Sequence, residues 1–599
     1  MDHETGKGGA DMIGSGNSNS GGTAIGSGSE SSAGNTTNTI HASDTNNGSS
    51  SNEQNTDKSV SDAQDSDQAS LNNKDSDTRP TNNSPQNGQN SMSANDASGQ
   101  DKPSQDKNES NVIGPDGYWT EDDLKAVFKH SHDVSFQSYQ LNENPQSRVI
   151  FALAEGLSDS SMLARFVLPG LLAMYEKGIL QDTQAKWTGE LPMVPVDRSA
   201  KPEELAETVF RGSMLVLLPA INTLFALDAA DPPRRVPNDS NTEISIKGPR
   251  DCFVEEIMTN MALIRKRIKS DSLCYESYVV GTRTKTRVGL IYFQDILSPK
   301  VLAEARKRLQ QIDIDGLYSL GQLEEIISDY KYSVLPMFDF SGRPDYAVSS
   351  LLAGRFVIIV DGNPMVLIGP GTLSLLMKSP EDIHFNFFYV SFARMIRLIS
   401  LLATLLLPGI WVALMAFHQD QLPFRMMATI SVSRLGLPLS PQMEFFILLL
   451  LLEIFREAGV RLPNPIGQTL TVVGGLIIGD ASIRAGLVSP SVVVVGAITA
   501  VAGVTLVNQT LSTTISVIRL FIFLLGCFLG MYGVILGIVL FAAYMSRLQS
   551  FGVPYTSPFS PMRLKELLPA FIRIPWKHMT NRPSQVHPID PDHQPEQAP

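Results

Sequence analysis

The long apolar region in the last third of the chain, residues 387–544, limits the possible folds more than any other feature. Two runs in it, Leu398–Phe417 and Leu520–Tyr544, contain no Asp, Glu, Lys or Arg. Each is long enough for an α-helix to cross the roughly 30 Å hydrocarbon core of a bilayer. Because a helix satisfies its own backbone hydrogen bonds in lipid, we predict an α-helical, multi-pass membrane domain.

Three weaker apolar segments lie between these runs. They are the Leu-rich Phe445–Leu452, the Gly-rich Ile466–Ile478, and Pro490–Val507. Short or Gly-interrupted segments are typical of broken or re-entrant helices. Basic residues flank the domain on both sides, which places both of its ends in the cytoplasm by the positive-inside rule and requires an even number of crossings. We expect four spans plus one partial helix. The flanking basic residues are Arg394, Arg397, Arg547, Arg563, Lys565, Arg573, Lys577 and Arg582.

The N-terminal tail, residues 1–115, has no Phe, Trp or Tyr and is rich in Ser, Asn, Gly and Asp. Such a segment buries too little apolar surface to fold, so we expect it to be disordered. The first 111 residues hold sixteen acidic and six basic side chains, which accounts for most of the net charge of −13. No basic domain remains that would indicate a nucleic-acid partner. The N-terminus lacks an apolar signal-peptide core, so the first span is expected to direct insertion.

The region between the tail and the membrane domain contains an internal repeat. Segments beginning at Arg148 and Arg287 align without a gap, and those beginning at Met214 and Phe356 follow in the same order. Each copy has apolar strands, a turn and a helix, so duplication is favoured over chance similarity. The predicted fold class is an α/β cytoplasmic region of two related subdomains followed by the membrane domain. The expected parts are residues 1–115 (tail), 116–240 and 241–385 (subdomains), 386–550 (membrane domain) and 551–599 (cytoplasmic C-terminal tail).

The second subdomain carries a basic stretch with two possible roles. An amphipathic helix is predicted over Phe253–Ile268, with basic residues at its C-terminal end complementing the helix dipole. The stretch that follows alternates basic residues and threonines, as on the two faces of a strand. The basic side chains could form an anion or lipid-headgroup site, or simply a solvated strand face, which is favoured. The candidate site consists of Arg250, Arg267, Arg283 and Lys285.

Ionisable residues within the apolar region are candidate pore or membrane-polar positions, because buried charges in lipid usually face protein or water. Either they line an aqueous passage, or they extend to the membrane surface. The two interpretations are balanced for Glu453, and surface extension is favoured for Arg484 and Arg519. The candidates are Glu444, Glu453, Arg456, Glu457, Asp480 and Arg484.

A glycine stripe occupies one face of the last predicted span, and such stripes allow close backbone approach. Helix packing is the favoured interpretation, although an oligomer of such helices could also conduct. The stripe consists of Gly526, Gly530, Gly533 and Gly537. No motif for a nucleotide, a catalytic triad or a metalloprotease is present, and the three cysteines lack metal-site spacing. We therefore expect neither an enzyme nor a cofactor or metal site.

Several long motifs resemble the GerA family of spore germinant receptor A subunits. They include KGPRDCFVEEIMTNMALIRKRIKS, RPDYAVSSLLAGRFVIIVDGNPMVLI and EIFREAGVRLPNPIGQTLTVVGGLIIGDASIRAGLVSP. The resemblance singles out Gly248, Pro249 and Arg250 and the turn at Asp361 and Gly362 as cytoplasmic motif positions. This sequence departs from the family pattern at Pro219 and Ala220, where family members often carry a second Asp-Gly type turn.

The resemblance implies an inner spore membrane protein with both termini in the cytoplasm. It also implies a transporter-like B subunit and a lipoprotein C subunit as partners, contact with membrane lipid, and a homo-oligomer. The expected function is a nutrient-gated receptor subunit that forms the ion-conducting part and triggers endospore germination. A non-conducting scaffold and a secondary transporter remain alternatives, although the membrane region shows no inverted repeat.

Overall fold

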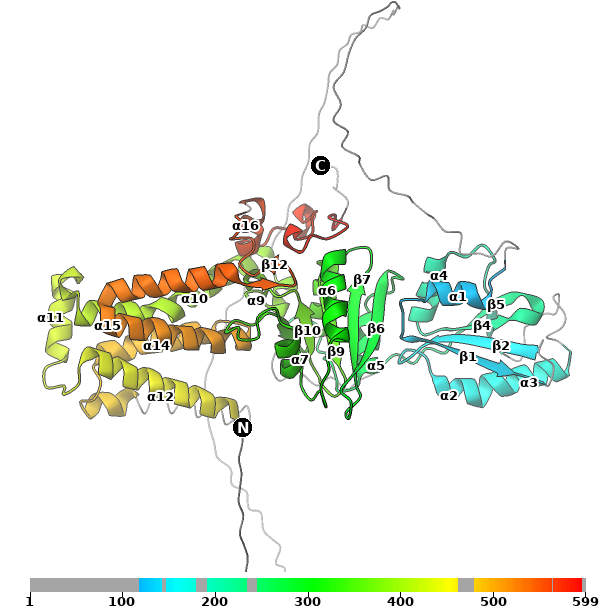
Figure 1. Cartoon of the computed structure of the whole chain (residues 1–599), viewed down its shortest axis with the longest axis horizontal. Coiled ribbons are helices and arrows are strands. Elements are labelled where there is room, and N and C mark those ends of the chain that lie inside the picture. The colour runs from blue at the N-terminus through cyan, green and yellow to red at the C-terminus, as the bar shows by residue number, and fades with distance from the viewer. Residues whose placement is uncertain are drawn as a thin grey trace, which may run out of the picture. The chain divides into compact units, whose positions relative to one another are not determined.

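The computed structural model describes residues 118–142, 147–178, 191–233, 245–461, 479–562 and 564–594. Figure 1 shows the elements coloured in chain order. The expected tail, the predicted subdomain boundary at residue 240 and the segment Ile466–Ile478 lie outside these described residues. The count of four spans plus one partial helix therefore stays a prediction.

The first subdomain is a five-stranded antiparallel sheet with the strand order β1-β2-β4-β5-β3. The central strands are apolar throughout because helices cover both faces. Alternate residues of β2 pack with α1 and α4 on one side and with α3 on the other. The elements are α1 (Glu121–Val127), β1 (Val134–Gln140), β2 (Arg148–Ala154), α2 (Ser160–Met162), η2 (Leu163–Val167), α3 (Leu168–Glu176), β3 (Met193–Pro195), α4 (Pro202–Phe210), β4 (Met214–Leu218), η4 (Pro219–Ile221) and β5 (Thr223–Leu227).

The second subdomain repeats this architecture, with the strand order β6-β7-β9-β10-β8. Strands β2 and β7, and likewise β4 and β9, hold equivalent places in the two sheets and contain the segments aligned in the sequence repeat. The shared strand order is what the predicted duplication requires. The elements are α5 (Ile257–Arg265), β6 (Leu273–Val280), β7 (Thr286–Phe293), α6 (Pro299–Gln310), α7 (Leu320–Ile327), β8 (Asp339–Ser341), α8 (Pro344–Leu352), β9 (Phe356–Val360), β10 (Val366–Gly369) and α9 (Leu373–Leu376).

Two sequence predictions in this subdomain are wrong. The helix expected over Phe253–Ile268 is shorter, because the Asn260 side chain bonds the backbone N–H and carbonyl of Val254 and holds that residue outside the helix. The single strand face expected for Arg283 and Lys285 is a turn. Strands β6 and β7 form a hairpin in which Val280 pairs with Thr286, so both basic residues lie in the connecting loop.

A buried ion pair joins the two subdomains. The Arg265 guanidinium, 0% exposed, donates to both carboxylate oxygens of Asp133 at 2.9 and 3.1 Å. Its planar group also lies 3.7 Å from the centre of the Phe210 ring. Arg265 lies in the last turn of α5, as the basic end of the predicted helix requires, but its charge is also paired with a residue of the other subdomain.

The remaining helices are apolar. Two of them, α10 and α15, are long and apolar enough to cross a membrane. The segment Phe445–Leu452, expected to be short, belongs to a helix of 21 residues, which is about 31 Å long at 1.5 Å per residue. The elements are α10 (Phe387–Ala416), η6 (Gln419–Gln421), α11 (Phe424–Ser433), α12 (Pro441–Arg461), α14 (Pro490–Val504), α15 (Gln509–Arg547), β11 (Gln549–Ser550), β12 (Val553–Pro554), α16 (Leu564–Phe571) and two short turns, η7 (Trp576–His578) and η8 (Ser584–Val586).

Helix α15 reverses direction at Gly530, so the single span expected over Leu520–Tyr544 is wrong. Gly530 has a non-helical backbone with φ +64°. A Cβ added at Gly526 would lie 3.2 Å from Val534, and one at Gly537 would lie 3.1 Å from Ile522. In a straight helix these pairs would be about 12 and 22 Å apart. The helix is therefore a hairpin of two antiparallel arms, 509–529 and 531–547, visible as paired orange helices in Figure 1.

Candidate functional site

The loop between α7 and β8, residues 328–338, contacts both ends of the α15 hairpin, and we call it the junction loop. At the start of the first arm, the Thr514 hydroxyl donates a 3.0 Å hydrogen bond to the Val334 carbonyl oxygen. At the end of the second arm, the Tyr544 hydroxyl accepts a 2.8 Å hydrogen bond from the Val334 N–H. One residue of the second subdomain thus bonds to both arms where they meet the sheet domain.

A second contact joins the first arm to the sheet itself. Asn508 is the N-cap of α15, and its side-chain oxygen accepts a 2.8 Å hydrogen bond from the Leu511 N–H. Its amide nitrogen donates to Asp339 Oδ1 on β8 at 2.6 Å, while the Tyr346 hydroxyl donates to Oδ2. Burial raises the pKa of Asp339 to about 6, despite these two donors. The start of the hairpin is therefore fixed to a buried carboxyl group.

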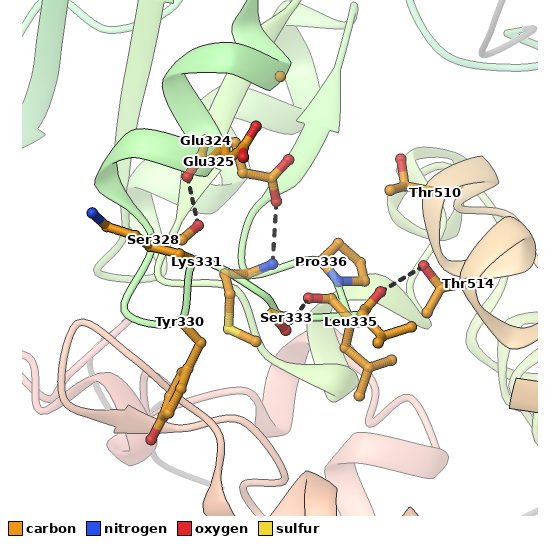
Figure 2. Close-up of a pocket in the computed structure, with 13 residues that line it drawn as sticks. Glu324, Glu325, Ser328, Tyr330, Lys331, Ser333, Leu335, Pro336, Thr510 and Thr514 are labelled. Carbon is orange, nitrogen blue, oxygen red and sulfur yellow. Dashed lines mark hydrogen bonds between the residues drawn. The ribbon is translucent and has the colours of Figure 1, made fainter. Parts of the chain in front are cut away.

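A hollow of about 270 Å³ opens beside the junction loop. Figure 2 shows Glu324 and Ser328 on the sheet-domain side and Thr510 and Thr514 on the facing helix. The volume is close to that of the smallest pockets that take small molecules, about 300 Å³. Its polar lining suits a small polar solute or water rather than an apolar ligand.

The Glu324 carboxylate is the most perturbed acid of this hollow. It accepts a 3.2 Å hydrogen bond from the Met337 N–H of the junction loop. Burial nevertheless raises its pKa to about 7, because no basic side chain among the described residues offsets the cost of the buried charge. Its charge therefore changes near neutral pH, next to the contacts that hold the hairpin.

We expect the stability of the full-length protein to fall as the pH rises from about 4.5 to 7, through this group. The folded state binds a proton at Glu324 that the unfolded chain has already released, so deprotonation costs folding free energy of about 3 kcal/mol at most. A Glu324→Gln variant stays neutral and should unfold at a higher temperature than the unmodified chain at pH 8 but not at pH 4. If the variant and the unmodified chain unfolded at the same temperature at pH 8 as well as at pH 4, Glu324 would not be a buried group that titrates in this range.

A cluster of charges links the first arm of α15 to α12. Glu453 forms an ion pair with Arg456 on its own helix and a 3.0 Å ion pair with Arg519 on α15. Arg456 in turn donates a 2.5 Å hydrogen bond to the Ser516 hydroxyl. The Arg519 side chain is 10% exposed, so the expected extension of this residue to the surface is wrong. Glu453 is a shared partner of two arginines.

The other candidate charges lie elsewhere. Glu444 is 0% exposed, accepts from the Ser489 N–H and lies 3.5 Å from Arg434, so it joins the start of α12 to the chain before α14. Asp480 and Arg484 form an exposed 2.8 Å pair one helical turn apart. Glu457 follows Glu453 by one turn on α12. The structure therefore does not bring all six candidates together, and a role for any of them in a pore stays a prediction.

The glycine stripe lies inside the hairpin. A Cβ at Gly533 would lie 2.1 Å from the Leu525 carbonyl oxygen, closer than any real contact. One at Gly526 would lie 3.0 Å from the carbonyl oxygen of Gly409 on α10. The close approach is thus between the chain's own arms and with α10. Packing between subunits through this face stays a prediction.

The Gly248–Arg250 motif passes over a second charged cluster. A Cβ at Gly248 would lie 2.3 Å from the guanidinium of Arg343, which is 2% exposed. Arg343 binds Asp345 at 2.7 Å and Glu381 at 2.6 Å, and Glu381 also accepts from the Lys247 N–H at 3.2 Å. The glycine is therefore required by a close approach, and Pro249 continues the segment.

The anion site proposed for the basic residues is not formed as a group. Arg267 pairs with Asp251 at 2.5 Å near the start of β6, whereas Arg283 lies in the turn after its end, beside Asp315. The two arginines thus pair with different carboxylates, and strand β6 lies between them in the chain. Arg250 precedes β6 in the chain, as Arg267 does. Lys285 lies with Arg283 in the turn that follows β6.

The turn at Asp361 and Gly362 connects β9 and β10, as expected from the Asp-Gly pair. Gly362 has φ +84°, a conformation that favours glycine. Asp361 accepts a 3.2 Å hydrogen bond from the Ile257 N–H and lies 3.4 Å from Arg287. In the first subdomain, η4 at Pro219 and Ala220 makes the equivalent turn with Asn222 at φ +49°. The two turns thus differ in sequence but fill the same place.

The sequence analysis missed the residues of the junction. Asn508 carries an N-cap signal, since it is followed three residues later by an apolar helix. Nothing local indicates that it also binds Asp339, which is 169 residues away. Glu324 belongs to an ordinary amphipathic pattern on α7. These contacts depend on how distant parts of the chain pack together, and hydrophobic periodicity in the sequence does not predict this packing.

Comparisons with known proteins give a consistent result. Residues 122–585 match the family profile described as Bacillus/Clostridium GerA spore germination protein. The chain is 42% identical over 469 residues to spore germination protein XA of Bacillus anthracis, covering 78% of this chain and 95% of that protein. It is 32% identical over 476 residues to the uncharacterized membrane protein YfkQ of Bacillus subtilis (strain 168), covering 80% of this chain and 92% of that protein.

A solved structure is also similar to part of the chain. It is the N-terminal domain of the A subunit of the Bacillus megaterium spore germinant receptor GerK3, at 28% identity and a TM-score of 0.32, covering 41% of this chain and 91% of that chain. The family profile itself extends over both subdomains and the apolar helices. The chain therefore belongs to the GerA family of spore germination proteins.

Proposed function

We propose that this chain is the A subunit of a nutrient germinant receptor that triggers endospore germination. It works in the inner spore membrane with both termini in the cytoplasm, beside a transporter-like B subunit and a lipoprotein C subunit. It acts without catalysis, as the oligomeric, ion-conducting part of the receptor. Family membership and the apolar helices α10 and α15 support this proposal.

The observation that carries the proposal is the attachment of both hairpin arms to one cytoplasmic loop. A shift of the junction loop would act on Thr514 and Tyr544 together, because both bond to Val334. The first arm would pass this shift to α12 through Arg519 and Glu453. Nutrient binding in a partner subunit would then favour an open arrangement of the hairpin over a closed one.

One observation favours a second candidate, a non-conducting scaffold. The Glu453 carboxylate, the strongest candidate for an ion-binding group, is already bonded by two arginines. Two neighbouring guanidinium groups neutralise the charge of this carboxylate, so it offers little attraction to a passing cation. In this alternative the junction would transmit a signal to a partner without an ion pathway in this chain.

Reconstitution of the receptor in liposomes separates these functions. With its B and C partners and nutrient present, the unmodified chain should support ion flux. An Asn508→Ala variant should lose about tenfold or more of this flux, since it removes a helix cap and leaves Asp339 without one of its two donors, together about 2 to 3 kcal/mol.

The matched control is Thr513→Ala on the same helical turn. Thr513 is exposed and bonds only the Gln509 carbonyl of its own helix in the described structure, so its flux should be normal. Absence of nutrient-evoked flux with every subunit present would favour the scaffold. Equal flux in the Asn508 and Thr513 variants would exclude the junction as the coupling element.

A further inference from the structure

A second hollow lies where the cytoplasmic region meets the first apolar helix. Two basic side chains, Lys378 and Arg394, line it together with apolar side chains that include Leu398, Leu401 and Phe571. Its closed part has a volume of about 30 Å³, the share of one water molecule in the liquid. That space fits a single ligand oxygen, so a larger headgroup would stay at the open mouth. The lining thus combines basic and apolar side chains, and α10 supplies both kinds on one face, since Arg394 precedes Leu398 by one helical turn.

The charges around this hollow are not balanced. Arg394 and Arg397 share one carboxylate, Asp382, at 3.1 and 2.7 Å. Arg573 bonds the backbone carbonyl oxygens of Asp382, Ile383 and Phe385 and brings no acid with it. Within the described structure, three arginines thus meet a single carboxylate.

Lys378 adds a further positive charge without a partner. Among the described residues its ammonium group makes no hydrogen bond or ion pair, whereas its backbone N–H bonds the Leu375 carbonyl. Burial, together with the neighbouring Arg394 and Arg355, lowers the pKa of Lys378 to about 7. A bound anion would remove this cost.

The neighbouring surface is apolar in a way that fits a membrane boundary. Phe388, Tyr389 and Phe392 in the first turns of α10 are 56 to 72% exposed. Leu568 on α16 and Trp576 beyond it are 59% and 52% exposed. Aromatic residues and amphipathic helices of this kind collect at the level of lipid headgroups. The ligand is therefore expected from the membrane and not from the bulk solution.

We propose that the mouth of this hollow binds the phosphate of an anionic phospholipid, one phosphate oxygen of which enters the hollow. Lys378 and Arg394 contact the headgroup, and the apolar side chains of α10, Phe559 and Phe571 contact the acyl chain. The proposal rests on the membrane location in the proposed function and not on ion conduction. A bound lipid would join α10, α9 and the C-terminal segment at one point. The lipid would thereby stabilise the attachment of the membrane domain to the cytoplasmic region.

The test uses the full-length chain in detergent with added dioctanoyl phosphatidylglycerol, measured by native mass spectrometry and thermal unfolding. The unmodified chain should retain this lipid and unfold at a higher temperature with it. Lys378→Gln should weaken retention at least about fivefold, the effect of one basic residue beside an anionic lipid. Without lipid, the same variant should unfold at a higher temperature than the unmodified chain, because it removes a partly buried ammonium group that has no hydrogen-bond or ion-pair partner among the described residues.

Three controls make the result specific. Lys378→Arg should restore retention, and Lys300→Gln, an exposed residue on α6, should leave it unchanged. Dioctanoyl phosphatidylcholine should be retained more weakly than phosphatidylglycerol. Equal retention by the unmodified chain and Lys378→Gln would overturn the proposal. Stabilisation by inorganic phosphate equal to that by phosphatidylglycerol would also overturn it, since the site would then take a free anion.

Discussion

Replacing Gly533 by alanine is expected to unfold the α15 hairpin. The new methyl group would lie 2.1 Å from the Leu525 carbonyl oxygen, and this neighbour is backbone that no rotamer change can move. Overpacking of a closed core usually costs 1–3 kcal/mol, and a clash with backbone belongs at or above the upper end, about 3 kcal/mol or more. The variant should unfold at a clearly lower temperature in detergent, and spores carrying it should not respond to nutrient.

The control is Gly503→Ala on the neighbouring helix α14. A Cβ there would meet Thr404 at 3.6 Å, an ordinary van der Waals distance, so the change should be neutral or slightly stabilising. Membrane insertion of both variants is measured separately, so that loss of the hairpin is distinguished from loss of the protein. If Gly533→Ala unfolded at the same temperature as Gly503→Ala and the unmodified chain, the two arms could not lie as close as described.

The hairpin also shows what hydropathy does not reveal. The run Leu520–Tyr544 predicts a span because it is apolar and long enough. Hydropathy measures length and polarity, whereas the direction of the chain depends on the conformation of a single residue, Gly530. The glycines of the stripe were the available signal, since the same spacing that suits packing with another subunit also suits packing of one arm on the other. The sequence alone does not distinguish these two partners.

The fold of the two sheet subdomains was more predictable. The repeat between Arg148 and Arg287 depends on apolar runs and turns, which are local features, and both sheets have the strand order that it requires. The turn between β6 and β7 was missed because alternating Thr, Arg and Lys residues imitate a solvated strand. Gly281 at φ +91° was the local indication of the reversal.

The candidate site could be predicted only in part. Glu453 was identified as unusual because a charge in an apolar region is costly. Its second partner, Arg519, lies 66 residues away, and only the packing of α12 against α15 brings the two together. The same holds for Asn508 and Asp339 at the junction. Local patterns therefore identified residues that need a partner, and the fold supplied the partners.

A comparably large effect is expected from Arg265→Met, which removes one half of the buried ion pair between the subdomains. The Arg265 side chain is 0% exposed and that of Asp133 is 2% exposed, so the variant leaves a buried carboxylate with neither a guanidinium nor water. Breaking a buried pair in this way typically costs 3–5 kcal/mol. In the full-length protein, the two subdomains should unfold at a lower temperature, and limited proteolysis should cut between them.

Two comparisons separate the ion pair from its surroundings. The double variant Arg265→Met with Asp133→Leu should recover most of the lost stability, because replacing both partners by apolar groups leaves no unpaired charge. Arg283→Met, which removes an ion pair whose side chains are 82% and 77% exposed, should change stability by less than about 0.5 kcal/mol. If Arg265→Met were no worse than Arg283→Met, the contact between the subdomains would not depend on this ion pair. If the double variant were as unstable as the single one, the loss would come from packing around Arg265, because no stranded carboxylate would remain to account for it.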